Sequence, residues 1–429
     1  MKPFNQIKLL GIVLVLGFAA SASAQANEIA GPAWGKTIIL SPFLEIWMDD
    51  VSNFSPVAAY NSKHNEYMVV WYNDHGQTAD IFARRVKPDG TLLDEFSIAQ
   101  DENQVYIEPD IVYSQIHDEY LIAYVRGGTF DDRDIIARRV KWDGSWMSGE
   151  ISIGRPDKTG DQVNPAVAYN YLADEYLVVY ENRWFDTKDI DAQRVRASDG
   201  AVQSWRNIAT GQGEFRHFPD VASSPGDDHY LITYWYQPGN STDPGDVKGK
   251  VISANMSTLS GEIDICVNAK DQRFPTVDSS SDEFLVAWEE NQDNLTTYVN
   301  VRRIASDGTP LGSADGFWIA GIPDQYNGSP IVVSGSTNGY MIVWYRTYTG
   351  VQYDLVARFV LYGSDIGYQS EFAIDDTPGD RWGPAAACST IGDCLVLEQV
   401  SFPDQLDLDI RGRFVEFEKL YMPLSIGGN

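Results

Sequence analysis

The chain has few cysteines, a shortage of basic residues and no long apolar stretch. Its 429 residues hold three cysteines and no CxxC pair, which excludes a zinc site built on cysteine spacing. Lys and Arg number 32 against 61 Asp and Glu, a net charge of −29 that disfavours nucleic acid and anionic membranes as partners. No run reaches the roughly 18 apolar residues of a membrane-spanning helix, so we expect no membrane insertion.

Residues 1–24 have the pattern of a secretory signal peptide. Lys2 and Lys8 form a basic start, residues 9–20 are apolar, and Ala22-Ser23-Ala24 supplies a small-residue cleavage site. We therefore expect an exported protein, periplasmic or extracellular, whose mature chain is one domain over residues 25–429. Without the two lysines its charge is −31.

A unit of about 55 residues repeats after this leader, and residues 165–199 show it best. Each unit opens with a proline, here termed the lead proline. The lead prolines lie 53 to 56 residues apart, at Pro56, Pro109, Pro165, Pro219, Pro275, Pro330 and Pro384. The next run recurs as EYMVVW (66–71), EYLIAY (119–124), EYLVVY (175–180), HYLITY (229–234), EFLVAW (283–288), GYMIVW (339–344) and DCLVLE (393–398). A third run recurs as DIFARRV (80–86), DIIARRV (134–140), DIDAQRV (189–195), DVKGKV (246–251), YVNVRRI (298–304), DLVARFV (354–360) and DIRGRFV (409–415). A fourth is marked by Ile98, Ile153, Ile208, Ile265, Ile319 and Ile374.

Each run has strand length, β-branched and aromatic enrichment, and turn residues at its ends. Four antiparallel strands at this period are typical of one β-propeller blade, so the chain is predicted to be all-β, a seven-bladed β-propeller. Residues 43–47 precede the first lead proline at the spacing of a fourth strand. We expect them to close the ring by pairing with the C-terminal unit, and residues 423–427 are the alternative.

The repeat PxVAYN…DEYLVVW…DIxARRVxxDG resembles that of tandem-repeat β-propeller proteins exported by bacteria, over nearly the whole mature chain. The resemblance implies the fold more than a function. Seven-bladed polysaccharide lyases are also similar in architecture, and they place a His pair near a Tyr and an Arg. This sequence has no such pair, so their catalytic residues are not transferred to it. It also lacks the SxDxGxxW boxes of sialidase-like propellers and a GxSxG nucleophile elbow.

In a propeller, the loops into first strands and the loops from second to third strands share one end of the ring, here termed the entry end. The opposite end is termed the turn end. Six arginines fall in entry-end loops among aromatic residues. We predict a ligand-binding set of Arg126, Arg183, Trp184, Arg273, Phe274, Tyr326, Arg346, Arg381, Trp382 and His75.

Crowded like charges are costly unless acids lie among them. Two interpretations of the arginines therefore stay open. They form ion pairs with Glu108, Glu181, Glu289 and Glu290, or they bind a uronate or sulfated glycan through guanidinium forks and aromatic faces.

The leading functional hypothesis is an exported, non-catalytic binding module, a monomer that receives an acidic polysaccharide or a protein segment at the entry end. The second is a lyase in which Arg216 neutralises a uronate carboxylate while His217 and Tyr236 supply base and acid. The third is a scaffold without a small-ligand site.

The remaining expectations concern cysteines, metals and the third strands. Cys388 and Cys394 flank a tight turn and are predicted to form a disulfide, while Cys266 is predicted to be buried. No cofactor or metal ligand set is identified, although calcium is compatible with the acidic composition. Mid-strand arginines recur and are expected in cross-strand ion pairs, at Arg85, Arg139, Arg194 and Arg303.

Overall fold

The computed structural model describes most of the chain after its leader. The described residues are 27–30, 37–40, 44–47, 52–127, 133–154, 160–184, 187–239, 244–280, 282–293, 295–335, 339–348, 352–364, 370–377, 379–401 and 408–417. Within them every regular element is a β-strand. None of these residues belongs to a helix of the length and apolarity needed to cross a membrane. The predicted signal peptide lies outside the described residues.

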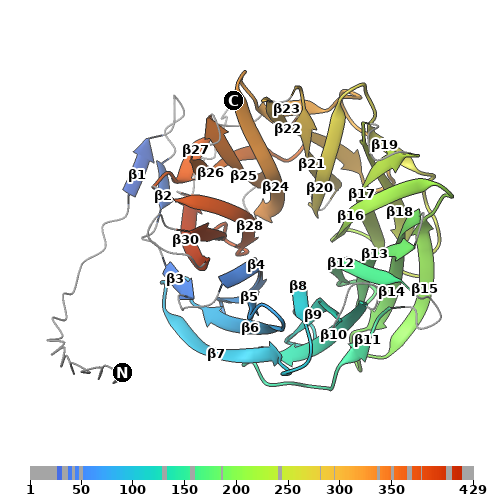
Figure 1. Ribbon diagram of the computed structural model, residues 1–429, viewed down its shortest axis with the longest axis vertical. Helices are drawn as coiled ribbons and strands as arrows, with labels where there is room; N and C mark the ends of the chain where they lie inside the picture. Colours follow the sequence, from blue (N-terminus) through green and yellow to red (C-terminus); the bar gives the residue numbers. More distant parts are fainter. Residues whose placement is uncertain are drawn as a thin grey trace, which may run out of the picture.

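Figure 1 shows the strands as radial sheets in sequence order around a central axis. The first two antiparallel groups are β4 (Ser52–Asn61), β5 (Glu66–Asp74), β6 (Ala79–Val86), β7 (Leu92–Ala99), and β8 (Tyr106–Ser114), β9 (Glu119–Arg126), β10 (Asp134–Lys141), β11 (Ile151–Ser152). The next two are β12 (Asp161–Asn170), β13 (Glu175–Trp184), β14 (Thr187–Arg196), β15 (Val202–Ala209), and β16 (Glu214–Ser223), β17 (His229–Pro238), β18 (Asp246–Ser253), β19 (Ile263–Cys266). A single parallel residue pair, Lys188 with Phe215, joins these two groups into one sheet.

Two further four-stranded groups complete the run of consecutive strands. They are β20 (Asp271–Ser279), β21 (Glu283–Asn291), β22 (Thr297–Ala305), β23 (Phe317–Ala320), and β24 (Gln325–Gly335), β25 (Gly339–Tyr348), β26 (Tyr353–Leu361), β27 (Phe372–Asp375). In every group the strand that carries the lead proline lies nearest the axis (Figure 1).

The last sheet combines the two ends of the chain. Its C-terminal strands are β28 (Asp380–Cys388), β29 (Cys394–Ser401) and β30 (Asp409–Phe417), and its N-terminal strands are β1 (Asn27–Ala30), β2 (Thr37–Leu40) and β3 (Leu44–Trp47). β3 pairs with β30 through Leu44 and Gly412, and β2 pairs farther along the same edge. The N-terminal strand thus takes the place expected for residues 43–47. The alternative, residues 423–427, lies outside the described residues.

A repeated contact fastens most of the strand groups to the one before. A cationic side chain on the third strand donates to the backbone carbonyl of the fourth-strand isoleucine of the preceding group. The pairs are Arg84 with Ile46, Arg138 with Ile98, Lys250 with Ile208, Arg302 with Ile265, Arg358 with Ile319 and Arg413 with Ile374. Because Ile46 belongs to β3, the first and last sheets are joined by the same contact as the internal ones.

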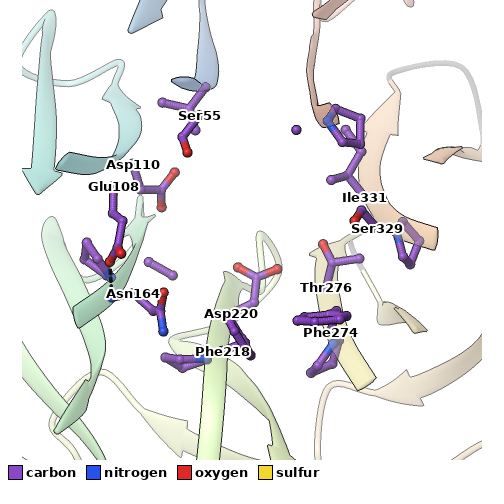
Figure 2. A pocket seen from close by; sticks show the side chains of 18 of the residues that line it. Ser55, Glu108, Asp110, Asn164, Phe218, Asp220, Phe274, Thr276, Ser329 and Ile331 are labelled. Carbon is purple, nitrogen blue, oxygen red and sulfur yellow. Dashed lines mark hydrogen bonds between the residues drawn. The ribbon is translucent and has the colours of Figure 1, made fainter. Parts of the chain in front are cut away.

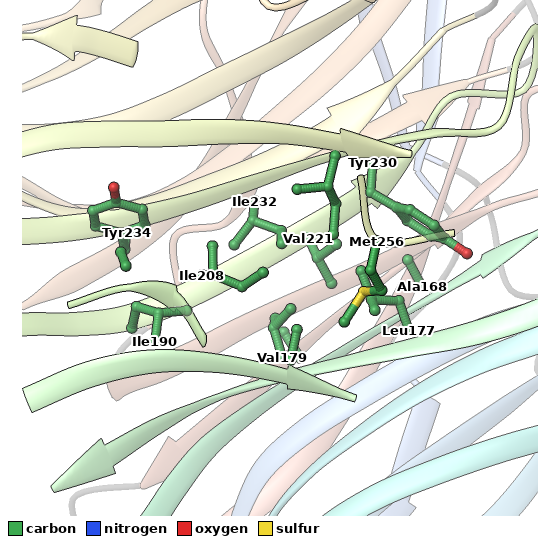
Figure 3. Close-up of a cluster of buried hydrophobic side chains, with 14 of the residues drawn as sticks. Ala168, Leu177, Val179, Ile190, Ile208, Val221, Tyr230, Ile232, Tyr234 and Met256 are labelled. Carbon is green, nitrogen blue, oxygen red and sulfur yellow. The ribbon is translucent and has the colours of Figure 1, made fainter. Parts of the chain in front are cut away.

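The hydrophobic core lies between neighbouring sheets, where their apolar faces pack together. Figure 3 shows one such cluster, in which Leu177, Val179 and Ile190 of one group meet Ile232 and Tyr234 of the next. Alternate residues of a strand point to opposite faces. The continuous apolar second strands are therefore buried on both sides, as EYLVVY of β13 is.

The side-chain predictions outside the site are largely confirmed. Cys388 and Cys394 form a disulfide, and Cys266 is buried with a free thiol. The mid-strand arginines pair across strands with acids, as Arg85–Glu66, Arg139–Glu119, Arg194–Glu175 and Arg303–Glu283 at 2.5 to 2.9 Å.

Candidate functional site at the entry end

A backbone bulge precedes every lead proline. The residue before each one has a left-handed φ between 47° and 54°, a conformation that is costly for non-glycine residues. The strand register also shifts there, for example between His217 and Asp220. The seven bulge residues are Ser55, Glu108, Asn164, Phe218, Phe274, Ser329 and Gly383. A bulge turns its strand and redirects side chains, and all seven residues line one cavity on the axis.

This entry-end cavity has a volume of about 410 Å³. Figure 2 shows side chains of several sheets around one central space, with the carboxylates of Asp110 and Asp220 directed into it. The rings of Phe218 and Phe274 meet edge to face with centroids 4.8 Å apart, and Trp235 packs near both. One part of the wall is therefore aromatic and another is rich in hydrogen-bond acceptors.

The two carboxylates also connect neighbouring sheets. Asp110 accepts the backbone N–H of Val167 at 2.7 Å, and Asp220 accepts that of Val277 at 2.8 Å. Burial raises the pKa of Asp110 to about 7, and the charge of Asp220 adds to the rise. Burial likewise raises the pKa of Asp220 to about 6. Both groups consequently titrate near neutral pH.

Acceptors from the preceding sheet hold several of the strained bulges. The N–H of Asn164 donates to Glu108 at 2.8 Å, and that of Phe218 donates to Glu181 at 3.4 Å. Burial opposes ionisation of Glu181, but the hydrogen bond from His217 and the charge of Arg183 lower its pKa to about 2. These contacts satisfy backbone donors that the bulge removes from the strand ladder.

The predicted arginines do not line this cavity. Their acidic partners are Glu150 for Arg126, Glu181 for Arg183, Glu214 for Arg216, Asp271 for Arg273, Asp354 and Glu371 for Arg346, and Asp375 and Glu398 for Arg381. Arg381 is completely buried. The ion-pair interpretation therefore describes these arginines, but of the four glutamates first considered only Glu181 is among these partners. A cationic funnel is not found among the residues that line the cavity.

The other predicted ligand-binding residues are spread over the entry end. Trp184, Tyr326 and Trp382 are exposed by 36 to 41%, and Phe274 lines the cavity. His75 lies 3.3 Å from the carboxylate of Asp80. The structure therefore brings Phe274 to the axis and leaves exposed aromatic rings as candidate outer contacts.

The three residues of the lyase hypothesis do not converge. Arg216 lies opposite Tyr236 in the strand pairing, with its guanidinium 5.2 Å from the tyrosine ring. His217 lies opposite Trp235, on the other face of the strand, and its Nδ1 is 3.2 Å from Glu181. The hypothesis treated neighbours in sequence as neighbours in one site, whereas a strand sends them to opposite faces.

The sequence reasoning missed the acidic wall. A weak signal existed, since Asp follows the lead proline in two repeats, at Pro109-Asp110 and Pro219-Asp220. Within the part of the chain that the structure describes, no group of three or more His, Cys, Asp or Glu side chains is arranged to hold a metal ion. Calcium stays a prediction.

Comparisons with known proteins concern the fold. No protein-family model and no curated protein matches the sequence. The β-propeller domain of the Trilobed protease from Pyrococcus furiosus aligns with a TM-score of 0.50 at 9% identity, over 89% of this chain and 100% of that one. The fold is a β-propeller.

Other solved propeller-like structures are similar over most of the chain. A protein of unknown function from Dyadobacter fermentans aligns with a TM-score of 0.57 at 10% identity, over 89% of this chain and 99% of that one. A polysaccharide lyase aligns with a TM-score of 0.55 at 8% identity, over 84% of this chain and 89% of that one. At these identities the likeness concerns the fold alone, so the function of this propeller has to be argued from its own residues.

Proposed function

We propose that this propeller is an exported, closed ring of seven blades that binds a glycan in the entry-end cavity and catalyses no reaction. The pairing of β3 with β30 and the Arg84–Ile46 contact support ring closure. The observation that carries the function is the cavity itself, which is lined by the Phe218–Phe274 pair and by the acceptors Asp110 and Asp220. A flat aromatic face beside convergent polar groups suits a sugar ring with several hydroxyls.

The charge of the wall favours a neutral glycan over the acidic one expected from the sequence. Asp110, Asp220 and Glu108 face the cavity, while the arginines that suggested an anionic ligand pair with acids elsewhere. A uronate carboxylate would be repelled by these groups, whereas sugar hydroxyls donate to them. The exposed rings of Tyr326 and Trp382 extend the contact surface for a longer chain.

A glycan array of neutral and uronate polysaccharides tests this function. We expect retention of a neutral glycan by the wild-type protein and loss of about tenfold in affinity in Phe218→Ala, since one aromatic platform is removed. Trp318→Ala is the matched control, because Trp318 is an exposed aromatic residue on the outer strand β23. Retention of uronate glycans only, unchanged in Phe218→Ala, would exclude this cavity as the site. Absorbance near 235 nm during the same incubations reports lyase activity, and we expect none.

A further inference from the structure

A second cavity lies at the turn end of the same inner strands. Its volume is about 490 Å³. The side chain four residues after the lead proline changes character around the ring. It is tyrosine in the first three repeats and small in the rest, in the order Tyr60, Tyr113, Tyr169, Ser223, Ser279, Ser334 and Cys388. One side of the turn-end cavity is therefore a wall of three tyrosines on neighbouring sheets. The small side chains at the same position of the other repeats leave the cavity open in front of this wall.

Hydrogen bonds fix the orientation of these tyrosines. The hydroxyls donate to turn residues of their own sheets, Tyr60 to Asn65 at 2.9 Å, Tyr113 to Asp118 at 2.8 Å and Tyr169 to Asp174 at 2.9 Å. Each ring also packs on a second-strand tyrosine, with centroids 5.1 or 5.2 Å apart. Because the hydroxyl protons are engaged, the wall offers ring surface to the cavity more than hydrogen-bond donors.

One carboxylate lies among the small side chains. Asp278 is the only charged side chain among the described residues that line this cavity. Its carboxylate accepts the backbone N–H groups of Ser279 at 2.7 Å and Ser334 at 2.6 Å, which hold it in place. No Lys or Arg is among the lining residues, so a cation entering here meets no like charge from that described wall.

We propose that the turn-end cavity binds a quaternary ammonium ion, with the Tyr60, Tyr113 and Tyr169 rings as its cation–π wall and Asp278 as its counter-ion. Aromatic faces attract such ions by their negative electrostatic surface. Part of the remaining wall is aliphatic, including Ala58, Val332 and Val333, and suits N-methyl groups, which need no hydrogen-bond partner. The other lining side chains are mostly neutral polar ones, among them Ser62, Gln115, Ser223, Ser334 and Thr390. The site is separate from the glycan cavity, which is lined by residues nearer the entry end.

Calorimetric titration with choline and with 3,3-dimethyl-1-butanol, its uncharged isostere, tests the proposal on the full chain. We expect choline to bind and the isostere to bind at least about tenfold more weakly, because only the charge differs. Equal affinity for both, or no choline binding at millimolar concentration, would overturn it.

Two variants at one position separate ring from hydroxyl. Tyr113→Phe keeps the ring, and we expect affinity within about twofold of wild type, whereas Tyr113→Leu should lose about tenfold. Asp278→Asn should lower the affinity for choline by a similar factor and leave the weak affinity for the uncharged isostere unchanged. Circular dichroism confirms that each variant is folded. Choline affinity unchanged in both Tyr113→Leu and Asp278→Asn contradicts the site. Phe218→Ala should leave choline binding intact, so failure of the glycan hypothesis is distinguishable from failure of this one.

Discussion

The hydroxyl of Tyr67 on β5 donates to the carbonyl oxygen of Asp393 at 2.7 Å, across 326 positions of the chain. An internal blade interface has the equivalent contact, since Tyr340 donates to the carbonyl of Glu283 at 3.0 Å. The first and last sheets are thus held by the same kind of bond as two consecutive ones.

Removing either hydroxyl tests whether the two interfaces are equally formed. Tyr67→Phe and Tyr340→Phe should each lower the free energy of unfolding by about 1 kcal/mol, because one hydrogen bond between sheets is lost. Each carbonyl keeps a backbone donor in both variants, Ser389 for Asp393 and Ser280 for Glu283, so the two losses are comparable. Chemical denaturation followed by circular dichroism gives both values. If Tyr340→Phe is destabilising and Tyr67→Phe is neutral, the ring is open in solution between the first and last sheets.

The buried ion pairs of Arg381 should matter far more than an exposed arginine pair. Arg381 is fully buried between Asp375 at 2.9 Å and Glu398 at 3.1 Å. Arg381→Ala removes the cation nearest to both buried acids and leaves the more distant Arg411, 3.5 Å from Asp375, so we expect a loss of about 3 to 5 kcal/mol in the free energy of unfolding. Arg126→Ala, whose pair is partly exposed, should cost less than about 1 kcal/mol. Similar losses in the two variants would contradict the structural role of Arg381.

The cavity carboxylates should make stability fall as pH rises. The pKa of Asp110 in the folded state is about 7, above its ordinary value of 3.8, so the folded protein holds its proton more tightly than the unfolded chain. This contribution is complete below pH of about 4 and is lost as pH rises through about 7. In Asp110→Asn, we expect a flatter fall in the free energy of unfolding across this window than in wild type.

Asp199 provides a control of opposite sign. Hydrogen bonds from Arg196 and the backbone of Ala201 lower its pKa to about 2. Asp199→Asn should therefore change the pH dependence only below about pH 4, where the wild-type contribution is lost on acidification. Identical profiles for Asp110→Asn and wild type between pH 4 and 7 would contradict the burial argument for Asp110.

The disulfide should raise the free energy of unfolding only modestly. Cys388 and Cys394 are six residues apart, so the bond closes a short loop and restricts the unfolded chain little. Loop-closure entropy gives about 2 kcal/mol for such a loop. We expect Cys388→Ser with Cys394→Ser to remain folded, with a free energy of unfolding lower by about that amount. Loss of folding would show a larger role for this bond.

Much of the fold was predictable, because the same pattern of strands and turns recurs in every repeat of the sequence. The spacing of the lead prolines indicated the inner strands, and the spacing of residues 43–47 from the first lead proline indicated their pairing with the C-terminal unit. Sequence spacing also placed Cys388 beside Cys394.

The site was less predictable, because it depends on where single side chains point. The left-handed bulge before each proline brings Phe218 and Phe274 to the axis, and composition carries no sign of it. The sequence left open whether the arginines form ion pairs or bind a ligand, and it did not identify distant partners such as Glu150 and Glu371, which lie 24 and 25 residues from Arg126 and Arg346. Asp110 and Asp220 were overlooked because Asp follows the lead proline in only two of the repeats.

The measurement that tests the glycan-binding claim most directly is a calorimetric titration of a neutral oligosaccharide into wild type, Phe218→Tyr and Phe218→Ala. Phe218→Tyr keeps an aromatic face at the cavity, so we predict wild-type affinity within about threefold, against a loss of about tenfold or more in Phe218→Ala. Equal affinity in all three proteins, with folding confirmed by circular dichroism, would contradict the assignment of the entry-end cavity as the glycan site.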